Sequence, residues 1–241
     1  AAGKVSESEN YSLGIALIFL CEVNPPAHMS TIQLYVDALL KLQKRHGGWG
    51  YIGSTLGDIS QLQYAVLGLW SAKNAGANVP DQAMADVVNY VIRVQDPTGA
   101  WGYQGRDPGN YTRTQQSTIR PSLCAAGCGS LYVGADFLGM SKKGEVRTIN
   151  GKPMPPALIP VVNREDRPGV RLAENVDVGR LKQAMEDGNR YIDNFNTLET
   201  DQYQLYFIYG LERWASFREK VEGFYEEEPD WYNDGVELLQ A

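Results

Sequence analysis

The chain has 241 residues, of which 43% are apolar and 21% are charged, so it is large and apolar enough to form one globular domain with a substantial core. Its formal net charge of −7 argues against nucleic-acid binding and against adhesion to an anionic membrane, because both need clustered Lys and Arg. The longest apolar run, Leu13 to Cys21, is far shorter than the roughly 20 residues of a membrane span. We therefore expect a soluble, acidic protein. No targeting segment is recognised at its start, and its compartment is left open.

Apolar periodicity predicts helices that alternate in kind along the chain, with almost no strand signal. The first, third, fifth and seventh helices are apolar or small nearly all the way round, which is typical of helices buried on most faces. The second and fourth carry a single apolar stripe, as between Ile32 and Leu40. This alternation predicts four helical hairpins in an inner and an outer layer. The expected ranges are 11–22, 31–45, 58–75, 81–95, 120–138, 178–195, 201–220 and 230–240.

A nine-residue motif, Q-x3-G-x-W-G-Y, occurs twice at an offset of 52 residues. Each Trp is expected to pack between neighbouring hairpins, and each Gln to hydrogen-bond backbone groups at a helix end, so we interpret these residues as structural. The start of a third copy is recognised near Gln240, and its truncation predicts that the chain is part of a longer protein. The repeated residues are Gln43, Gly47, Trp49, Gly50 and Tyr51 in the first copy, and Gln95, Gly99, Trp101, Gly102 and Tyr103 in the second.

Two aspartates are predicted to begin buried helices. Asp58 and Asp201 both stand in the pattern D-x-x-Q-L, in which the carboxylate caps the helix and Gln at the fourth position returns a hydrogen bond to the cap residue. The stretch 139–177 fits no helix, because it holds five of the twelve prolines and no apolar period. We expect it to be an ordered insertion, either a lid or a strap over one rim.

The Q-x3-G-x-W-G-Y repeat, placed between an amphipathic helix and a mostly apolar one, resembles the QW-type repeat of the terpenoid cyclase and protein prenyltransferase superfamily. The run from Gly47 to Trp70 is similar to squalene-hopene-cyclase-like repeat proteins. The resemblance covers about residues 11–138 and 200–241. It implies an all-α fold, the α/α toroid, in which two concentric rings of helices surround a cavity. Four hairpins are fewer than a closed toroid needs, so residues 1–241 are expected to be one incomplete toroid domain.

The catalytic motifs of this superfamily are eroded here. Its cyclases use D-x-D-D as a proton donor, and only Asp58 of that motif remains in this chain. The dipole and amides of a helix N-terminus favour the ionised carboxylate, so we expect Asp58 to be a cap and a poor acid. Its prenyltransferases need zinc held by Asp, Cys and His, but His28 and His46 are the two histidines present. No metal and no cofactor are expected.

Two functions are compatible with these observations. The first is a noncatalytic toroid module, a binding or scaffold domain whose protein partner, or the remainder of a longer chain, docks on C-terminal side chains. Those side chains are Trp214, Phe217, Phe224, Tyr225, Trp231 and Tyr232. The alternative is an isoprenoid-handling enzyme with Asp58 as its acid and an apolar ligand in an aromatic cavity. The cavity candidates are Tyr64, Trp70, Tyr132, Tyr206 and Tyr209.

Overall fold

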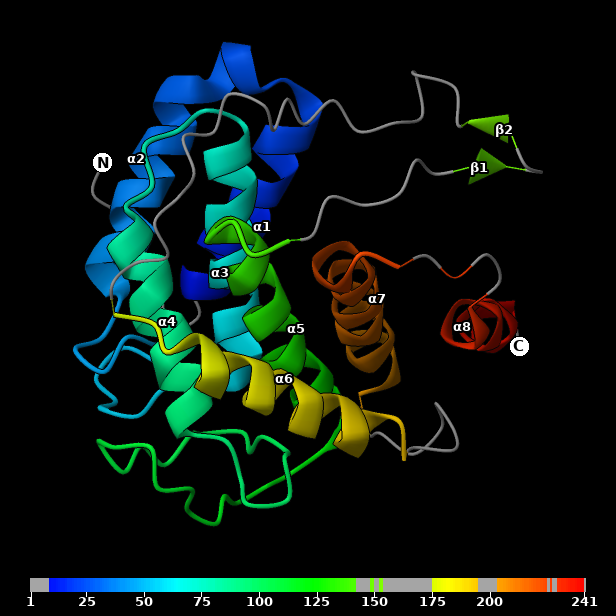
Figure 1. The fold of residues 1–241 in the computed structure, drawn as a ribbon. Coiled ribbons are helices and arrows are strands. Elements are labelled where there is room, and N and C mark those ends of the chain that lie inside the picture. Colours follow the sequence, from blue (N-terminus) through cyan, green and yellow to red (C-terminus); the bar gives the residue numbers. More distant parts are fainter. Residues whose placement is uncertain are drawn as a thin grey trace.

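The computed structural model describes residues 9–141, 148–149, 152–153, 175–194, 203–224, 226 and 229–240. Within these ranges the chain forms eight α-helices and one pair of two-residue strands (Figure 1). The helices are α1 (Glu9–Val23), α2 (Pro25–Leu42), α3 (Ile59–Asn74), α4 (Asp81–Arg93), α5 (Pro121–Phe137), α6 (Val178–Ile192), α7 (Gln204–Glu222) and α8 (Asp230–Gln240). The strands β1 (Thr148–Ile149) and β2 (Lys152–Pro153) pair antiparallel. The prediction of an all-α protein is confirmed.

The main error in the expected helix ends concerns α2. The apolar stripe predicts a start at residue 31, whereas α2 begins at Pro25, directly after its N-cap residue Asn24. Proline suits the first turn of a helix because its missing N–H would have no partner there. The Asn24 side chain accepts a hydrogen bond from the Ala27 amide at 3.4 Å. The first turn of α2 is therefore set by capping and not by apolar periodicity.

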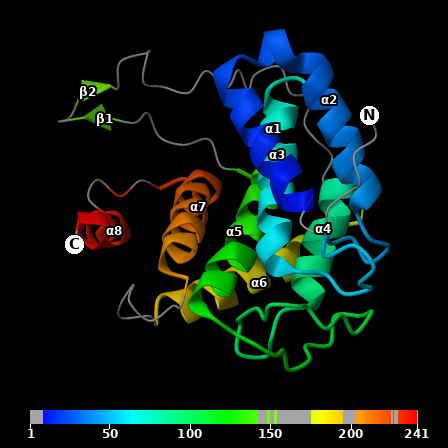
Figure 2. The same cartoon turned by 180° about the vertical axis from the view of Figure 1, so that it is seen from behind.

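The odd-numbered helices form a row in which α1 packs on α3, α3 on α5 and α5 on α7. These four helices run in the same direction, so their N-terminal ends lie at one end of the molecule, the lower end in Figure 1. The amphipathic helices α2, α4 and α6 pack against this row, and α8 lies beside α7, away from the other helices in both Figure 1 and Figure 2. Apolar and small residues all round α3 and α5 suit their central places in the row.

Two junctions of the same construction connect α2 to α4 and α4 to α6. After α2, Gln43 Nε2 donates to the carbonyls of Gly47 and Ala83 at 2.7 and 2.9 Å. After α4, Gln95 Nε2 donates to the carbonyls of Gly99 and Ala184, both at 2.9 Å. In each case one bond closes the turn and the other binds the next amphipathic helix, which is α4 for Gln43 and α6 for Gln95. The repeated glutamine therefore links successive hairpins.

The repeated Trp and Gly complete each junction. Trp49 and Trp101 are fully buried, and their indole N–H groups donate to the carbonyls of Leu39 and Val91 at 2.8 and 2.9 Å. The glycine of the second turn, Gly99, has a φ of +93°, and a Cβ there would lie 2.5 Å from the Asp187 carbonyl oxygen. Glycine is required because it alone combines this φ with so close an approach.

The predicted insertion at 139–177 lies largely outside the described residues. The parts that are described are its first three residues, the two short strands and the three residues before α6. No helix in the described ranges is both long and apolar enough to cross a membrane.

Candidate functional site

A cavity of about 450 Å³ lies at the N-terminal ends of the odd-numbered helices. Its volume falls within the range of small-molecule sites in proteins. Every one of α1, α3, α5 and α7 contributes residues from its first turn or its cap, and the loop between α4 and α5 closes the wall. The lining residues are Tyr11, Ser60, Tyr103, Thr118, Arg120, Ser122, Leu123, Tyr203 and Tyr206.

Asp58 lies behind this cavity, fully buried, as the N-cap of α3. Its Oδ1 accepts hydrogen bonds from the amides of Ser60 and Gln61 at 2.8 and 3.1 Å, and from the Ser60 hydroxyl at 2.5 Å. The Tyr11 hydroxyl lies 2.5 Å from Ser60 Oγ, so a chain of polar groups leads from Asp58 to the cavity wall. Burial raises the pKa of the Asp58 carboxyl, although its hydrogen bonds from Ser60 and Gln61 act to lower it. The helix amides are a local feature of the sequence, whereas burial, the larger effect on this pKa, comes from the packing of the helices.

The Gln of the predicted capping box does not return a bond to the cap. The Asp58 amide donates instead to the Trp49 carbonyl at 2.7 Å, so no donor is left for Gln61. The Gln61 Oε1 accepts from Asn10 Nδ2 at 2.9 Å. The side chain of Gln61 thus links α3 to α1 and does not close the capping box. The second predicted cap, Asp201, lies outside the described residues.

Arg120 and Thr118 form the part of the wall that precedes α5. The Arg120 guanidinium lies over the Tyr203 ring, 5.2 Å from its centroid, so residues before α5 and α7 contact each other across the cavity. Thr118 has a positive φ of 55°. No other non-glycine residue of the described ranges has a positive φ. A β-branched residue is strained in that conformation. The strain lies directly on the cavity wall.

Three of the five predicted cavity aromatics lie together, and two do not. The Tyr64 and Tyr209 rings stack with centroids 5.3 Å apart, and Tyr64 also contacts Tyr206 at 6.5 Å and Tyr11 at 5.3 Å. Of the five, Tyr206 is on the cavity wall, and its hydroxyl donates to the Ser60 carbonyl at 3.3 Å. Tyr64 and Tyr209 form an aromatic cluster between α3 and α7.

Trp70 and Tyr132 serve buried polar networks elsewhere. The Trp70 indole donates to Asp136 Oδ2 at 2.7 Å, and Lys220 donates to the same oxygen at 2.7 Å. Tyr132 is fully buried, and its hydroxyl accepts from Asn189 Nδ2 at 2.7 Å. Both networks join α5 to its neighbours and stabilise the row of helices.

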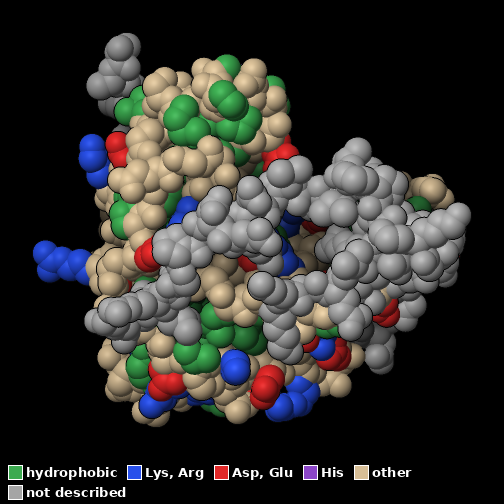
Figure 3. Space-filling model, turned by 45° about the horizontal axis from the view of Figure 1, so that its top comes forward, with side chains coloured by type: hydrophobic (Ala, Val, Ile, Leu, Met, Phe, Trp, Pro, Cys, Tyr) green, Lys and Arg blue, Asp and Glu red, His purple; other side chains and the backbone are tan. Residues whose placement is uncertain are grey.

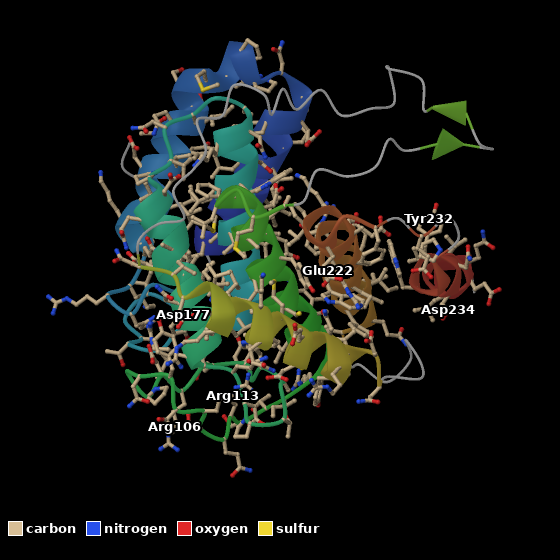
Figure 4. The ribbon with its side chains drawn as sticks, viewed as in Figure 1. Arg106, Arg113, Asp177, Glu222, Tyr232 and Asp234 are labelled. Carbon is tan, nitrogen blue, oxygen red and sulfur yellow. The ribbon has the colours of Figure 1, made fainter. Side chains whose placement is uncertain are left out.

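The predicted partner surface on C-terminal aromatics needs correction. Trp214 and Phe217 are 7% and 5% exposed, because α7 packs them into the core, so they offer no docking surface. Phe224 and Tyr232 are exposed, and Tyr232 lies on α8 at the edge of the molecule (Figure 4). Trp231 is half-buried against the core cluster, and Tyr225 lies outside the described residues.

A second candidate site is an apolar surface on α1 and α2. Ile15, Phe19 and Val23 follow one another at intervals of four on α1 and are 51%, 62% and 59% exposed. On α2, Leu34 is 63% exposed, and Asp37 is exposed beside it. We call these five residues the open face. Figure 3 shows hydrophobic side chains at the end of the molecule formed by these two helices.

The open face carries a motif that the sequence reasoning missed. The outer helices share the pattern Q-x3-D, and in each the Gln Nε2 donates to the Asp Oδ1, at distances between 2.7 and 3.0 Å. The three pairs are Gln33–Asp37 in α2, Gln82–Asp86 in α4 and Gln183–Asp187 in α6. In α4 and α6 the residue that follows the Gln of this pattern is Ala83 or Ala184. Its carbonyl accepts the hydrogen bond from Gln43 or Gln95 of the preceding junction. The corresponding residue of α2 is the exposed Leu34.

The described ranges hold no group of three or more His, Cys, Asp or Glu side chains placed to bind a metal ion. Comparisons with models of protein families, with curated protein sequences and with solved structures find no match for this chain.

Proposed function

We propose that the chain is a noncatalytic α/α-toroid module, a binding or scaffold domain that joins head to tail with another helical repeat of the same kind. The observation that carries this proposal is the open face. α4 and α6 each receive a glutamine turn from the preceding hairpin, whereas α2 presents the same acceptor pattern to solvent. The occupant that fits is a helix end with a glutamine turn, because that is what covers the equivalent positions at Ala83 and Ala184.

The distribution of exposed apolar side chains supports head-to-tail joining. Large exposed hydrophobic residues in the described ranges concentrate at the two ends of the row of helices. Those at the α1–α2 end are Ile15, Phe19, Val23 and Leu34, and those at the α7–α8 end are Tyr203, Leu205, Phe224, Tyr232 and Leu239. Exposed apolar patches of this kind mark interaction sites. An interface between unlike ends extends a row, as heterologous contacts do.

The toroid assignment rests on the alternation of the two helix sets. Parallel helices, of which the central α3 and α5 are apolar or small nearly all round, form a row, and amphipathic helices pack against it through repeated glutamine junctions. A ring of inner and outer helices is an extension of this arrangement. The absence of a chemical role rests on the cavity wall, which carries no carboxylate, histidine or cysteine among its described residues.

Sedimentation velocity across a range of chain concentrations tests the proposal. We expect the parent chain to self-associate as concentration rises, and Phe19→Glu to remove this association by placing a charge on the open face. The control is Ile52→Glu, because Ile52 is 43% exposed but lies outside both ends of the row. A parent chain that stays monomeric, and that is also recovered without a protein partner by native mass spectrometry from its source, would overturn the proposal.

The alternative function, an isoprenoid-handling enzyme, is favoured by one observation. Burial raises the pKa of Asp58, which brings this carboxyl closer to the range of a proton donor, and tyrosine rings lie nearby. Incubation of the parent and of Asp58→Asn with squalene and with a prenyl diphosphate tests it. Product from the parent that is lost in Asp58→Asn would replace the binding function with this one, whereas equal product from both would remove Asp58 from any mechanism.

A further inference from the structure

We propose that the cavity at the N-terminal ends of α1, α3, α5 and α7 binds a small organic anion, with Arg120 pairing with its carboxylate or phosphate group. This site is independent of the open face, which lies on other residues. The nine described side chains of the wall include one cation and no anion. A ligand with one negative charge therefore complements the charge of the wall.

Among the described residues, Arg120 has no carboxylate beside its guanidinium, unlike comparable arginines. Four other arginines of the described ranges are half-buried, and each forms an ion pair with a carboxylate. The pairs are Arg93–Asp107, Arg113–Asp187, Arg213–Glu212 and Arg218–Asp193. Within the same ranges Arg120 has the Tyr203 ring as its neighbour and no carboxylate. A planar guanidinium held in place on an aromatic ring is suited to bidentate contact with an oxyanion.

The helices around the cavity add to this charge. The partial positive charge of a helix N-terminus favours an anion, and four such ends surround the same space. Asp58 offsets the contribution of α3, because its carboxylate accepts hydrogen bonds from the amides of Ser60 and Gln61, so the favourable partial charge comes from α1, α5 and α7. The anionic end of the ligand is therefore expected at Arg120, the cation of the described wall.

The remainder of the wall selects the body of the ligand. Four of the nine lining residues are tyrosines, Tyr11, Tyr103, Tyr203 and Tyr206, and Leu123 adds an apolar side chain. Tyrosine rings offer flat apolar faces with a polar edge, which suits a ring-shaped ligand. The volume of about 450 Å³ admits a small molecule and excludes a folded macromolecule. The ligand class is thus a ring compound that carries a carboxylate or a phosphate.

Isothermal titration with matched probes tests this inference on the full chain. Benzoate is compared with benzamide, and phenyl phosphate with phenol, so that each pair differs in charge and the two anions distinguish carboxylate from phosphate. We expect at least one anion to bind about tenfold or more tightly than its neutral partner, as a charge-assisted pair predicts. Arg120→Met should abolish that preference and leave the weak binding of the neutral probe unchanged, and Arg120→Lys should retain part of it.

The control variant is Arg106→Met, because Arg106 is exposed on the same loop and is not on the wall (Figure 4). It should bind the anions as the parent does. Equal affinity for the charged and neutral members of both pairs, an anion preference that survives in Arg120→Met, or no binding of any probe at millimolar concentration would each overturn the inference. Thermal unfolding of each variant confirms that the folded chain is compared.

Discussion

Replacing the repeated glutamines one at a time compares how much each junction contributes to the free energy of unfolding. The two junctions share the same donor bonds but differ in the burial of the glutamine. Gln95 is fully buried, donates to Gly99 and Ala184, and accepts from an Arg113 NH2 group at 2.8 Å. Gln43 is half-buried and makes the two equivalent donor bonds without an arginine. Methionine has a similar length and no hydrogen-bonding amide, so Gln→Met removes these bonds with little change in volume.

The expected losses follow from the bonds that each variant removes. A neutral hydrogen bond contributes about 1 kcal/mol net, and one to a charged group about 1.5–3 kcal/mol. Arg113 keeps Asp187 as a partner, which limits the cost of losing Gln95. We expect Gln95→Met to lower the free energy of unfolding by about 3–4 kcal/mol and Gln43→Met by about 1–2 kcal/mol, out of a total of about 5–15 kcal/mol for a domain.

Urea unfolding followed by circular dichroism measures both losses, with the slope of the transition checked for each variant. The control is Gln115→Met, because Gln115 is exposed and forms none of these junction bonds, so a change within about 0.5 kcal/mol is expected. Equal losses at Gln95 and Gln43, or a larger loss at Gln43, would refute the reasoning. Such a result would mean that neither the burial of Gln95 nor its bond from Arg113 adds to the stability of the junction.

Three further outcomes are expected. Gly99→Ala should cost more than Gly53→Ala, by about 1–3 kcal/mol in urea unfolding, because both glycines have positive φ but only Gly99 meets the Asp187 carbonyl while Gly53 faces open space. Thr118→Gly should raise the free energy of unfolding by about 1 kcal/mol or leave it unchanged, since it relieves a positive φ of 55°; a clear loss would contradict the strain at this position. Burial lowers the pKa of His46, so the unfolded chain takes up this proton first and stability should fall as pH drops from about 6.5 toward the lower folded pKa. His46→Gln should show a smaller fall in urea midpoint over that interval, and an identical fall would exclude His46 as its cause.

The helices could be predicted because their signals are local. Apolar periodicity and capping residues lie within one element, and every predicted helix in the described ranges is present. The partners of the repeated glutamines could not be predicted in the same way. Gln43 and Gln95 bond to the carbonyls of Ala83 and Ala184, and a backbone carbonyl leaves no mark on the side-chain sequence. The signal that was available is the Q-A-M-x-D run shared by α4 and α6, which begins one residue before each acceptor.

The cavity was harder to predict because its wall is assembled from distant segments. Tyr11, Arg120 and Tyr203 come together only because α1, α5 and α7 run parallel in one row, so that their first turns meet at one end. The signal for these wall residues is their shared place in the first turn or the cap of alternate helices. The sequence instead directed attention to aromatics in the middle of the helices, such as Trp70 and Tyr132, whose surroundings are polar networks of the core.

The spacing of the junctions shows how the chain accommodates its proline-rich stretch. The two junction glutamines, Gln43 and Gln95, are 52 residues apart, whereas their acceptors, Ala83 and Ala184, are 101 residues apart. Yet α6 contacts the second turn through the residues that correspond to those of α4 at the first turn. In both junctions an alanine carbonyl accepts from the glutamine, and an aspartate carbonyl lies against the turn glycine. The position of α6 is therefore set by its contact with Gln95 and Gly99 and not by the length of chain before it. Because the entropic cost of a loop grows only slowly with its length, such a junction tolerates a long added segment without loss of the repeat.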